Sequence, residues 1–590
     1  MNTFFEKAIN HLYKHRILWS FLAILAISIL DVCHYFSTDG QLFYADTDCY
    51  TRALRILDWL NDFKWHEKIY PYSNVPDGFV LHFTRINDII WVVLSLPFML
   101  FEPLKEAVFH GGMLFSPLFF FLSLTALFWG IHPYIGKLKK NSASFALVFV
   151  TTLLFCYRSL NIFDFSYPDH HSAMFCIFCF NIAIILRFID NNKENYFLPA
   201  GLTCGLGLWF SSAIEGMLVT SVVLAILGFN WLYGILKSKH LILFGSGLFV
   251  SVTLAWLINP PYGGYGVLDI SRLSIIHVVL TALMLLTLIS LVTADNISTT
   301  LKIMCLCGCG IIVLLLLFII FGAALLLKPL YSEEIHAIYL PYVADLKSVF
   351  HTSYLYYYNY IFSWVAGLLI LGFLFYSKFS KTCVLNLALL VLLTLPLGFT
   401  ALRLYPYYLC VFLYLNGIII FLLMHLSQKN IKYGFAVLTY LLLIIFFQAS
   451  FKSEIHALPT PDFNNDVNNL ATDYKLSVHL TWKQGIKTLS SPYHTDEEGL
   501  IDNHKLFFAT DENEIKQLLQ KHRINYVYLP QTEFNNGKVS YRSDYYIEPE
   551  KNIDKFYGKI MTGKNIYNWL EAVPSDLKNG TVYKVRFELF

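Results

Sequence analysis

Between residues 311 and 327 the chain reads IIVLLLLFIIFGAALLL, without a single charged side chain. A helix needs about 20 consecutive apolar residues to cross a bilayer, and the flanking residues extend this run to that length. Backbone groups exposed to lipid must be paired within the segment, so the run is expected to be helical. The stretch therefore predicts a membrane-spanning helix.

The rest of the 590-residue chain has the same character. Hydrophobic residues make up 56% and charged residues 14%, with a mean hydropathy of +0.53, whereas soluble domains are about 25% charged. The net charge of +2 indicates no nucleic-acid partner. Cys305, Cys307 and Cys309 alternate within an apolar run, where a helix would scatter their side chains, so we interpret them as packing residues.

Lysines and arginines assign the ends of the predicted spans to the two sides of the membrane. The basic residues 1–16 place the N-terminus in the cytoplasm, and residues 17–35 are long enough to be a retained span and not a cleaved signal. Residues 89–101 are short and contain Pro97, which favours a helix at the interface. Further spans are predicted near residues 113–131, 145–160, 173–188, 197–213, 217–236, 241–258, 275–292, 304–327, 361–376, 385–401, 407–425 and 433–447.

The predicted fold is a polytopic α-helical membrane protein of about 13 spans with a small extracytoplasmic α/β domain at the C-terminus. Residues 1–449 form the membrane domain, and its two large loops, 37–110 and 328–360, lie on the same outer side as residues 450–590. The C-terminal domain mixes a helical pattern at 511–522 with a strand pattern at 525–529. No cysteine follows Cys410, so this domain must be stable without disulfides.

Acidic residues gather on the predicted outer side. Asp46 and Asp48 are separated by one residue in the first large loop, a spacing that lets two carboxylates face one hard cation but that is also common by chance. Asp169 and His171 lie between two spans, where an aspartate could instead cap a helix, a role worth about 1 kcal/mol.

The second large loop and the last spans add further polar residues. Glu333, Glu334 and Asp345 belong to the loop, where solvated surface charge is the default interpretation. Arg403 at an outer boundary either extends toward the interface or anchors an anionic phosphate. Other polar residues on this side are Glu215, His82, Arg85 and the stretch 269–277.

Several of these motifs resemble those of one family. The segment 43–52, FYADTDCYTR, is similar to the first acidic motif of the oligosaccharyltransferase catalytic subunits, which are GT-C membrane glycosyltransferases. The segment 168–171, PDHH, resembles their second motif, with histidine where the family often has glutamate. The closest similarity is to a divergent bacterial branch that carries the motifs found here at 76–78, 82–85 and 492–494. The tail has only two isolated tryptophans and lacks the Trp-Trp-Asp motif of the asparagine-linked enzymes.

The resemblance implies transfer of a glycan from a polyprenyl phosphate or diphosphate to a protein, lipid or glycan acceptor, assisted by Mg or Mn in a bacterial inner membrane, with the C-terminal domain in the periplasm. Asp48 would bind the metal and orient the acceptor, with support from Asp46. Asp169 and His171 would be further metal ligands, and imidazole suits Mn better than Mg. The substrate-binding residues implied are Arg403, Arg85, His82 and an acid among Glu334, Glu333 and Asp345.

Two alternatives stay open at this point. A transporter would place polar groups near the middle of the membrane, whereas the predicted spans here are poor in charge. A non-catalytic membrane subunit of a glycan-assembly system would not need Asp46, Asp48 and Asp169, but His171 in place of a carboxylate is compatible with it.

Overall fold

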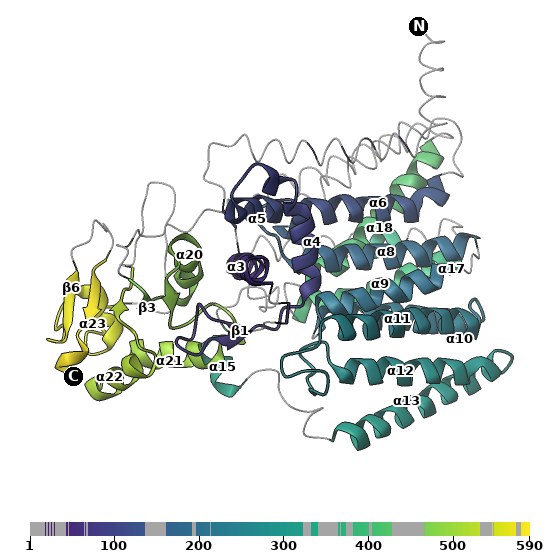
Figure 1. The fold of residues 1–590 in the computed structure, drawn as a ribbon. Coiled ribbons are helices and arrows are strands. Elements are labelled where there is room, and N and C mark those ends of the chain that lie inside the picture. Colours follow the sequence, from purple (N-terminus) through teal and green to yellow (C-terminus); the bar gives the residue numbers. More distant parts are fainter. Residues whose placement is uncertain are drawn as a thin grey trace, which may run out of the picture.

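The structure is a computed structural model of the full chain. It describes residues 43–135, 161–191, 196–322, 332–341, 364–372, 381–400, 404–427, 467–530, 546–573 and 580–590, apart from single positions within these ranges, together with isolated positions at 18, 22, 25, 29 and 463. The described part divides into a helical bundle, a first large loop and a C-terminal region that contains a sheet (Figure 1).

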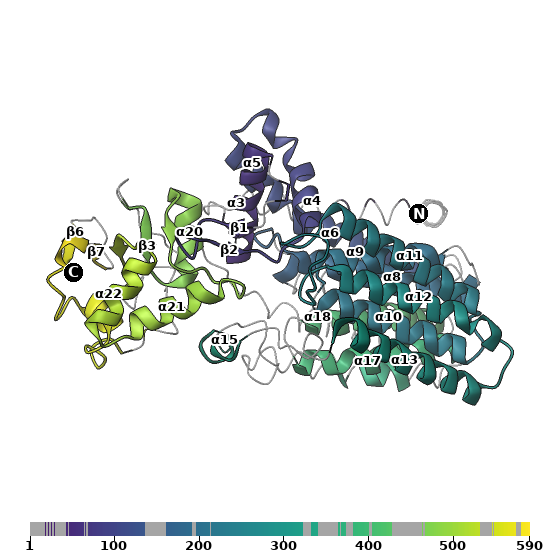
Figure 2. The same cartoon turned by 60° about the horizontal axis from the view of Figure 1, so that its bottom comes forward.

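Long apolar helices form the bundle, which Figures 1 and 2 show from two sides. Within the described residues, six stretches are long and apolar enough to cross a membrane, and three apolar helices are shorter. The prediction of a polytopic helical membrane protein is confirmed. The helices are α6 (Phe115–Ile135), α8 (His170–Asn191), α9 (Phe197–Phe210), α10 (Glu215–Leu232), α11 (Ser238–Ile258), α12 (Ile275–Ser290), α13 (Thr299–Phe321), α17 (Lys381–Thr400) and α18 (Tyr405–Ser427).

The number of spans stays a prediction. The expected spans 145–160 and 433–447 lie outside the described residues, 17–35 is described at single positions only, and 361–376 only in part. Between α8 and α13 the helices alternate in direction along the chain, as the sequence predicted (Figure 1).

The predicted interfacial segment 89–101 is divided between two short helices. It falls in α4 (Arg85–Ser95) and the 3-10 helix η1 (Phe98–Leu100), followed by α5 (Leu104–Met113). In Figure 1, α4 runs across the direction of α6 and α8 near the end of the bundle. Its neighbours Leu100 and Phe101 are 76% and 86% exposed, which favours contact with a membrane surface.

Glycines allow α9 and α11 to approach closely. A Cβ added to Gly201 would lie 1.9 Å from the carbonyl oxygen of Phe244, and one added to Gly247 would lie 2.4 Å from that of Leu198. Small residues are typical of such interfaces because apolar burial drives helix association less in lipid than in water.

Replacing Gly201 with valine is therefore expected to lower the thermal unfolding midpoint of the detergent-solubilised protein, at a cost of about 1–3 kcal/mol or more from overpacking. The matched control is Gly228→Ala in α10, because a Cβ there meets nothing within 4 Å. An unchanged midpoint for Gly201→Val would contradict the close packing of these two helices.

The C-terminal region contains a five-stranded sheet in the order β4-β3-β5-β7-β6, in which β3 pairs in parallel with β4 and β5, and β7 pairs antiparallel with β5 and β6. The residues predicted as helix 511–522 contain α22, and the predicted strand 525–529 contains β5. The elements are β3 (Asn469–Ala471), α20 (Tyr474–Gln484), β4 (Lys487–Thr488), α21 (Glu497–Phe508), α22 (Glu512–Lys521), β5 (Tyr526–Val527), α23 (Phe556–Thr562), β6 (Leu570–Val573), β7 (Val582–Val585) and η10 (Phe587–Leu589).

The first large loop docks onto the edge of this sheet. Its two-stranded hairpin of β1 (Ile69–Tyr70) and β2 (Phe79–Val80) holds the intervening residues against the end of β4. The amide of Thr488 donates to the carbonyl of Tyr72 at 2.9 Å, and the amide of Asn74 donates to that of Leu489 at 3.2 Å. These bonds continue the backbone pairing of the sheet into the loop, so the two parts of the chain are fixed relative to each other.

A buried carboxyl group reinforces this junction. Asp496 accepts hydrogen bonds from the Ser73 hydroxyl at 2.6 Å and from the amide and hydroxyl of Ser491 at 2.7 and 2.9 Å. Burial raises the pKa of Asp496 to about 7, against these hydrogen bonds and the nearby charge of His522, which favour the ionised form. Folding therefore favours the protonated form of Asp496 over its ionised form.

This pKa predicts a pH-dependent stability. The stabilisation from the protonated Asp496 is complete below the ordinary pKa of 3.8 and is lost as the pH rises through about 7. We expect the thermal midpoint to fall as the pH rises from about 4 to about 7 and to level off above about pH 8, and Asp496→Asn to remove this contribution because the amide stays neutral. The control is Asp511→Asn at the exposed start of α22. An equal fall in wild type and Asp496→Asn would show that another group titrates.

Candidate functional site

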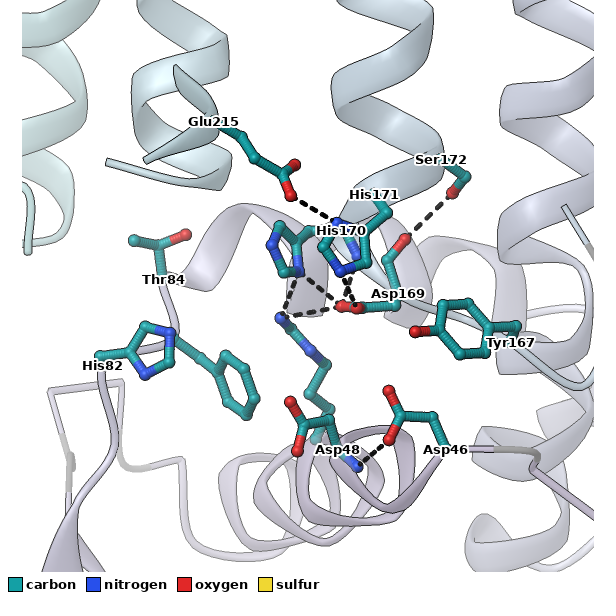
Figure 3. Close-up of polar contacts among 12 residues, drawn as sticks. Asp46, Asp48, His82, Thr84, Tyr167, Asp169, His170, His171, Ser172 and Glu215 are labelled. Carbon is teal, nitrogen blue, oxygen red and sulfur yellow. Dashed lines mark hydrogen bonds and ion pairs between the residues drawn. The ribbon is translucent and has the colours of Figure 1, made fainter. Parts of the chain in front are cut away.

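The first acidic motif begins the helix α3 (Thr47–Asp62). Asp46 is the N-cap residue, and its carboxylate accepts from the amide of Asp48 at 3.3 Å, which satisfies one of the free amides of the first turn. Asp48 and Arg52 are four residues apart and therefore lie on the same face of α3. Figure 3 shows this face turned toward the start of α8.

Arg52 joins the two predicted acidic motifs. Its guanidinium group lies 3.2 Å from a carboxylate oxygen of Asp169 and 3.2 Å from Nδ1 of His170, and both members of the ion pair are almost completely buried. The guanidinium also stacks on Phe83, 3.6 Å from the ring centroid. Arg52 thus brings the motif at 46–48 and the motif at 168–171 together.

A chain of polar contacts extends from Asp169 into the bundle (Figure 3). Nε2 of His171 lies 3.3 Å from Asp169, and its Nδ1 lies 2.7 Å from Glu215 at the start of α10. The other carboxylate oxygen of Glu215 accepts from the Tyr407 hydroxyl at 2.9 Å. The imidazole of His171 therefore lies between two carboxylates, with Nδ1 toward Glu215 and Nε2 toward Asp169.

The two aspartates have opposite electrostatic environments. Burial, together with the negative charges of Asp46 and Asp169, raises the pKa of Asp48 well above its ordinary value of 3.8. Burial alone would also raise the pKa of Asp169, but the charges of His170, His171 and Arg52 hold it well below that value. The ionised form of Asp48 is therefore unfavourable in this site. A cation bound beside it would stabilise that form.

Metal-ligand atoms cluster at the start of α8. One ligand atom each from Asp169, His170 and His171 lies within 4.8 Å of the others. In His171, Nδ1 faces the carboxylate of Glu215 and Nε2 faces Asp169. Metal-binding histidines usually have such a carboxylate beside the nitrogen that does not bind the metal. These residues fit a divalent cation, and a donor set with imidazole favours Mn or Zn over Mg.

The remaining predicted residues lie in several places. The side chain of Arg85 donates to Asp88 at 2.9 Å and to the carbonyl of Trp65 at 2.9 Å, both in the first large loop, and its backbone amide donates to the side chain of Asn259 at 2.9 Å. His82 contacts Tyr493 of the C-terminal region, with 2.6 Å between Nδ1 and the hydroxyl oxygen.

The second large loop is only partly described. Glu333 and Glu334 begin α15 (Glu333–Ile338), which packs against the C-terminal region through Ile335, and their side chains are exposed. Asp345 and Arg403 lie outside the described residues, so their predicted roles stay predictions.

The sequence interpretation passed over several residues of this cluster. Arg52 was part of the quoted motif, and its position four residues after Asp48 could have identified it as a partner on the same helix face. The motif at 168–171 contains His170 but indicates no role for it, and the sequence does not distinguish Glu215 from the other polar residues of the predicted outer side. Tyr407 and Tyr493 join the cluster from distant parts of the chain. Tyr493 belongs to the motif at 492–494, whereas no local pattern marks Tyr407.

The chain is similar in three dimensions to solved structures of AglB, the archaeal oligosaccharyltransferase from Archaeoglobus fulgidus. The complex of AglB with an inhibitory peptide and a dolichol-phosphate has 11% sequence identity and a TM-score of 0.67 over 95% of this chain and 80% of that one. The apo form of the A. fulgidus oligosaccharyltransferase has 13% identity and a TM-score of 0.68 over 95% and 79%. The chain has the oligosaccharyltransferase fold. No protein-family model and no curated protein sequence matches it.

This similarity confirms the predicted resemblance at the level of the fold. It covers the helical bundle and the C-terminal region together, because 95% of the chain is matched. A third structure, of the same A. fulgidus enzyme with Zn and sulfate, has 14% identity and a TM-score of 0.61 over 96% of this chain and 72% of that one. Within this oligosaccharyltransferase fold, the acidic and histidine cluster is the candidate active site.

Proposed function

We propose that the protein is a membrane glycosyltransferase that transfers a sugar or oligosaccharide from a polyprenyl phosphate or diphosphate donor to an acceptor on the periplasmic side of a bacterial inner membrane. The observation that carries the proposal is the buried contact between Arg52 and Asp169, which joins the two acidic motifs at one end of a membrane bundle. The oligosaccharyltransferase fold supports it, and one similar structure holds a dolichol-phosphate and a peptide.

Asp169 and His171, together with His170 of the same cluster, would hold a divalent cation, and Asp48, which faces them from α3, would be a further ligand. Such a cation would neutralise the negative charge that develops on the departing phosphate group. The chain's own residues prepare the site for it. Arg52 pairs with the carboxylate of Asp169, and Glu215 lies beside Nδ1 of His171, which places Nε2 toward Asp169.

The role of Glu215 can be tested by metal binding alone. Glu215→Gln is expected to weaken the binding of Mn by about 10- to 100-fold, because the carboxylate that orients the imidazole of His171 is lost. The measurement is Mn binding by electron paramagnetic resonance on the purified protein. Glu102→Gln is the matched control, since Glu102 contacts Nδ1 of His110 at 2.6 Å elsewhere in the first large loop. Equal affinities in the two variants would exclude an orienting role for Glu215.

The function itself is tested in cells with and without the gene. Mass spectrometry of their glycoproteins and glycolipids should reveal a glycan-bearing product that requires the gene and that returns when the wild-type gene is restored. Loss of the gene without any change in glycoproteins or glycolipids would contradict the proposal. In that case solute uptake into membrane vesicles would test the transporter alternative.

A further inference from the structure

A cluster of rings connects the first large loop with the C-terminal region. The ring of His82 is nearly parallel to that of Tyr493, with an interplanar angle of 19° and 5.0 Å between their centroids. The ring of His494 lies 4.6 Å from that of His82. Because Tyr493 is buried and bonded to His82, the C-terminal region fixes the position of this imidazole.

His82 also borders the candidate active site. Figure 3 shows it across from His170 and on the same side of the cluster as Thr84. The next residue, Phe83, carries the guanidinium of Arg52 on its ring. The side chain of His82 is only partly buried.

The surroundings of His82 keep its imidazole neutral. Burial lowers the pKa of His82 well below its ordinary value of 6.5, and the positive charges of His494, Arg52, His170 and Arg272 lower it further. A neutral imidazole has one N–H and one lone pair. The hydroxyl oxygen of Tyr493 lies 2.6 Å from Nδ1 and 3.2 Å from Nε2 of His82. In the tautomer in which Nδ1 donates its proton across the shorter contact, Nε2 carries the lone pair that can accept a proton.

We propose that His82 accepts the proton of an acceptor hydroxyl group, and that Tyr493 and His494 are positioning residues for its imidazole. This inference rests on the proposed function and names its acceptor chemistry. A neutral base suits a hydroxyl nucleophile, which must lose one proton during transfer. An amide nitrogen is a poor match, because its lone pair is delocalised into the carbonyl group.

The transfer step balances as follows. The acceptor oxygen forms a bond to the anomeric carbon of the sugar while the bond from that carbon to the donor phosphate oxygen breaks. The hydroxyl proton passes to Nε2 of His82, and the phosphate or diphosphate leaves with the electron pair of the broken bond. The protonated His82 then returns its proton to water.

The linkage in the product tests the acceptor class. The product that requires the gene is isolated from both glycoproteins and glycolipids, and the attached atom is identified by fragmentation mass spectrometry. A glycan on the oxygen of a serine, threonine, lipid or sugar supports the proposal, and the fraction that contains it identifies the source of the hydroxyl. A glycan on an asparagine nitrogen overturns it. Absence of any product would instead contradict the proposed function.

The role of His82 is tested in membrane vesicles that contain the cell's own lipid-linked donor. His82→Ala is expected to lower the rate of product formation by about 100-fold or more, the usual contribution of a general base. Added imidazole should restore part of this rate, which it would not do for a purely structural residue. The matched control is His66→Ala, an exposed histidine of the same loop. A wild-type rate in His82→Ala, or a lowered rate that imidazole does not raise, would overturn the proposal.

Tyr493→Phe tests the positioning role separately. Removal of the hydroxyl is expected to lower the maximal rate by about 10-fold with little change in the apparent KM, because the ring of His82 loses its hydrogen bond but not its stacking partner. Tyr262→Phe, on an exposed tyrosine of another loop, is the control. An unchanged rate in Tyr493→Phe would show that the phenol does not position His82.

Discussion

Replacement of Asp48 with asparagine is expected to lower glycan transfer by about 100- to 1,000-fold without loss of stability. Asp48 is in the first turn of α3, facing Asp169, and burial together with two neighbouring carboxylates raises the pKa of its own carboxyl group. Its ionised form therefore costs folding free energy, and a neutral amide of the same shape removes that cost. Activity should fall while the thermal midpoint stays equal or rises, a trade-off typical of functional residues.

The measurements are product formation in membrane vesicles and thermal unfolding in detergent. Asp62→Asn is the matched control, because Asp62 is an exposed aspartate at the other end of the same helix. Asp169→Asn should also abolish transfer. Normal transfer in both Asp48→Asn and Asp169→Asn would remove the proposed active site, and a lowered midpoint for Asp48→Asn would contradict the destabilised state of its carboxylate.

Arg52→Met is expected to destabilise the protein by about 3–5 kcal/mol, the usual cost of removing one member of a buried ion pair. Arg52 and Asp169 are both almost fully buried, and the variant leaves the carboxylate of Asp169 without its arginine partner. The thermal midpoint and the yield of folded protein after detergent extraction measure the effect. The double variant Arg52→Met, Asp169→Asn should recover much of the loss, because no unpaired carboxylate then remains.

The matched control for this pair is Arg272→Met. Arg272 pairs with Asp269 at 3.6 Å, but both side chains are partly exposed, so the expected loss is below about 1 kcal/mol. If Arg52→Met and Arg272→Met cost the same, or if the double variant is no more stable than Arg52→Met, the buried pair does not hold the two motifs together.

The two tryptophans of the C-terminal region, Trp482 and Trp569, have packing roles in the structure. The carbonyl oxygen of Trp482 accepts a hydrogen bond from Lys105 at 2.6 Å, and its ring lies 5.9 Å from that of Tyr50, so this residue holds the C-terminal region against the first large loop. Trp569 is fully buried and donates to Glu512 at 2.7 Å. Both serve packing in this structure, a role that their isolated positions in the sequence neither predicted nor excluded.

The sequence by itself determined that the chain is a helical membrane protein, because long apolar runs have only one way to pair their backbone groups in lipid. Its short acidic motifs also predicted that Asp48 and Asp169 belong to one site, and the two motifs meet in the structure through Arg52. These features depend on neighbours in the chain or on a short motif, so local patterns were sufficient to predict them.

Only the tertiary structure decided which side chains surround those aspartates. Arg52 reaches Asp169 across 117 residues, Tyr407 reaches Glu215 across 192, and Tyr493 reaches His82 across 411. Such contacts arise from the packing of α3, α8, α10 and α18 and from the docking of the C-terminal region on the first large loop. No spacing in the sequence encodes them, because each contact depends on the positions of whole helices and not on the residues next to it.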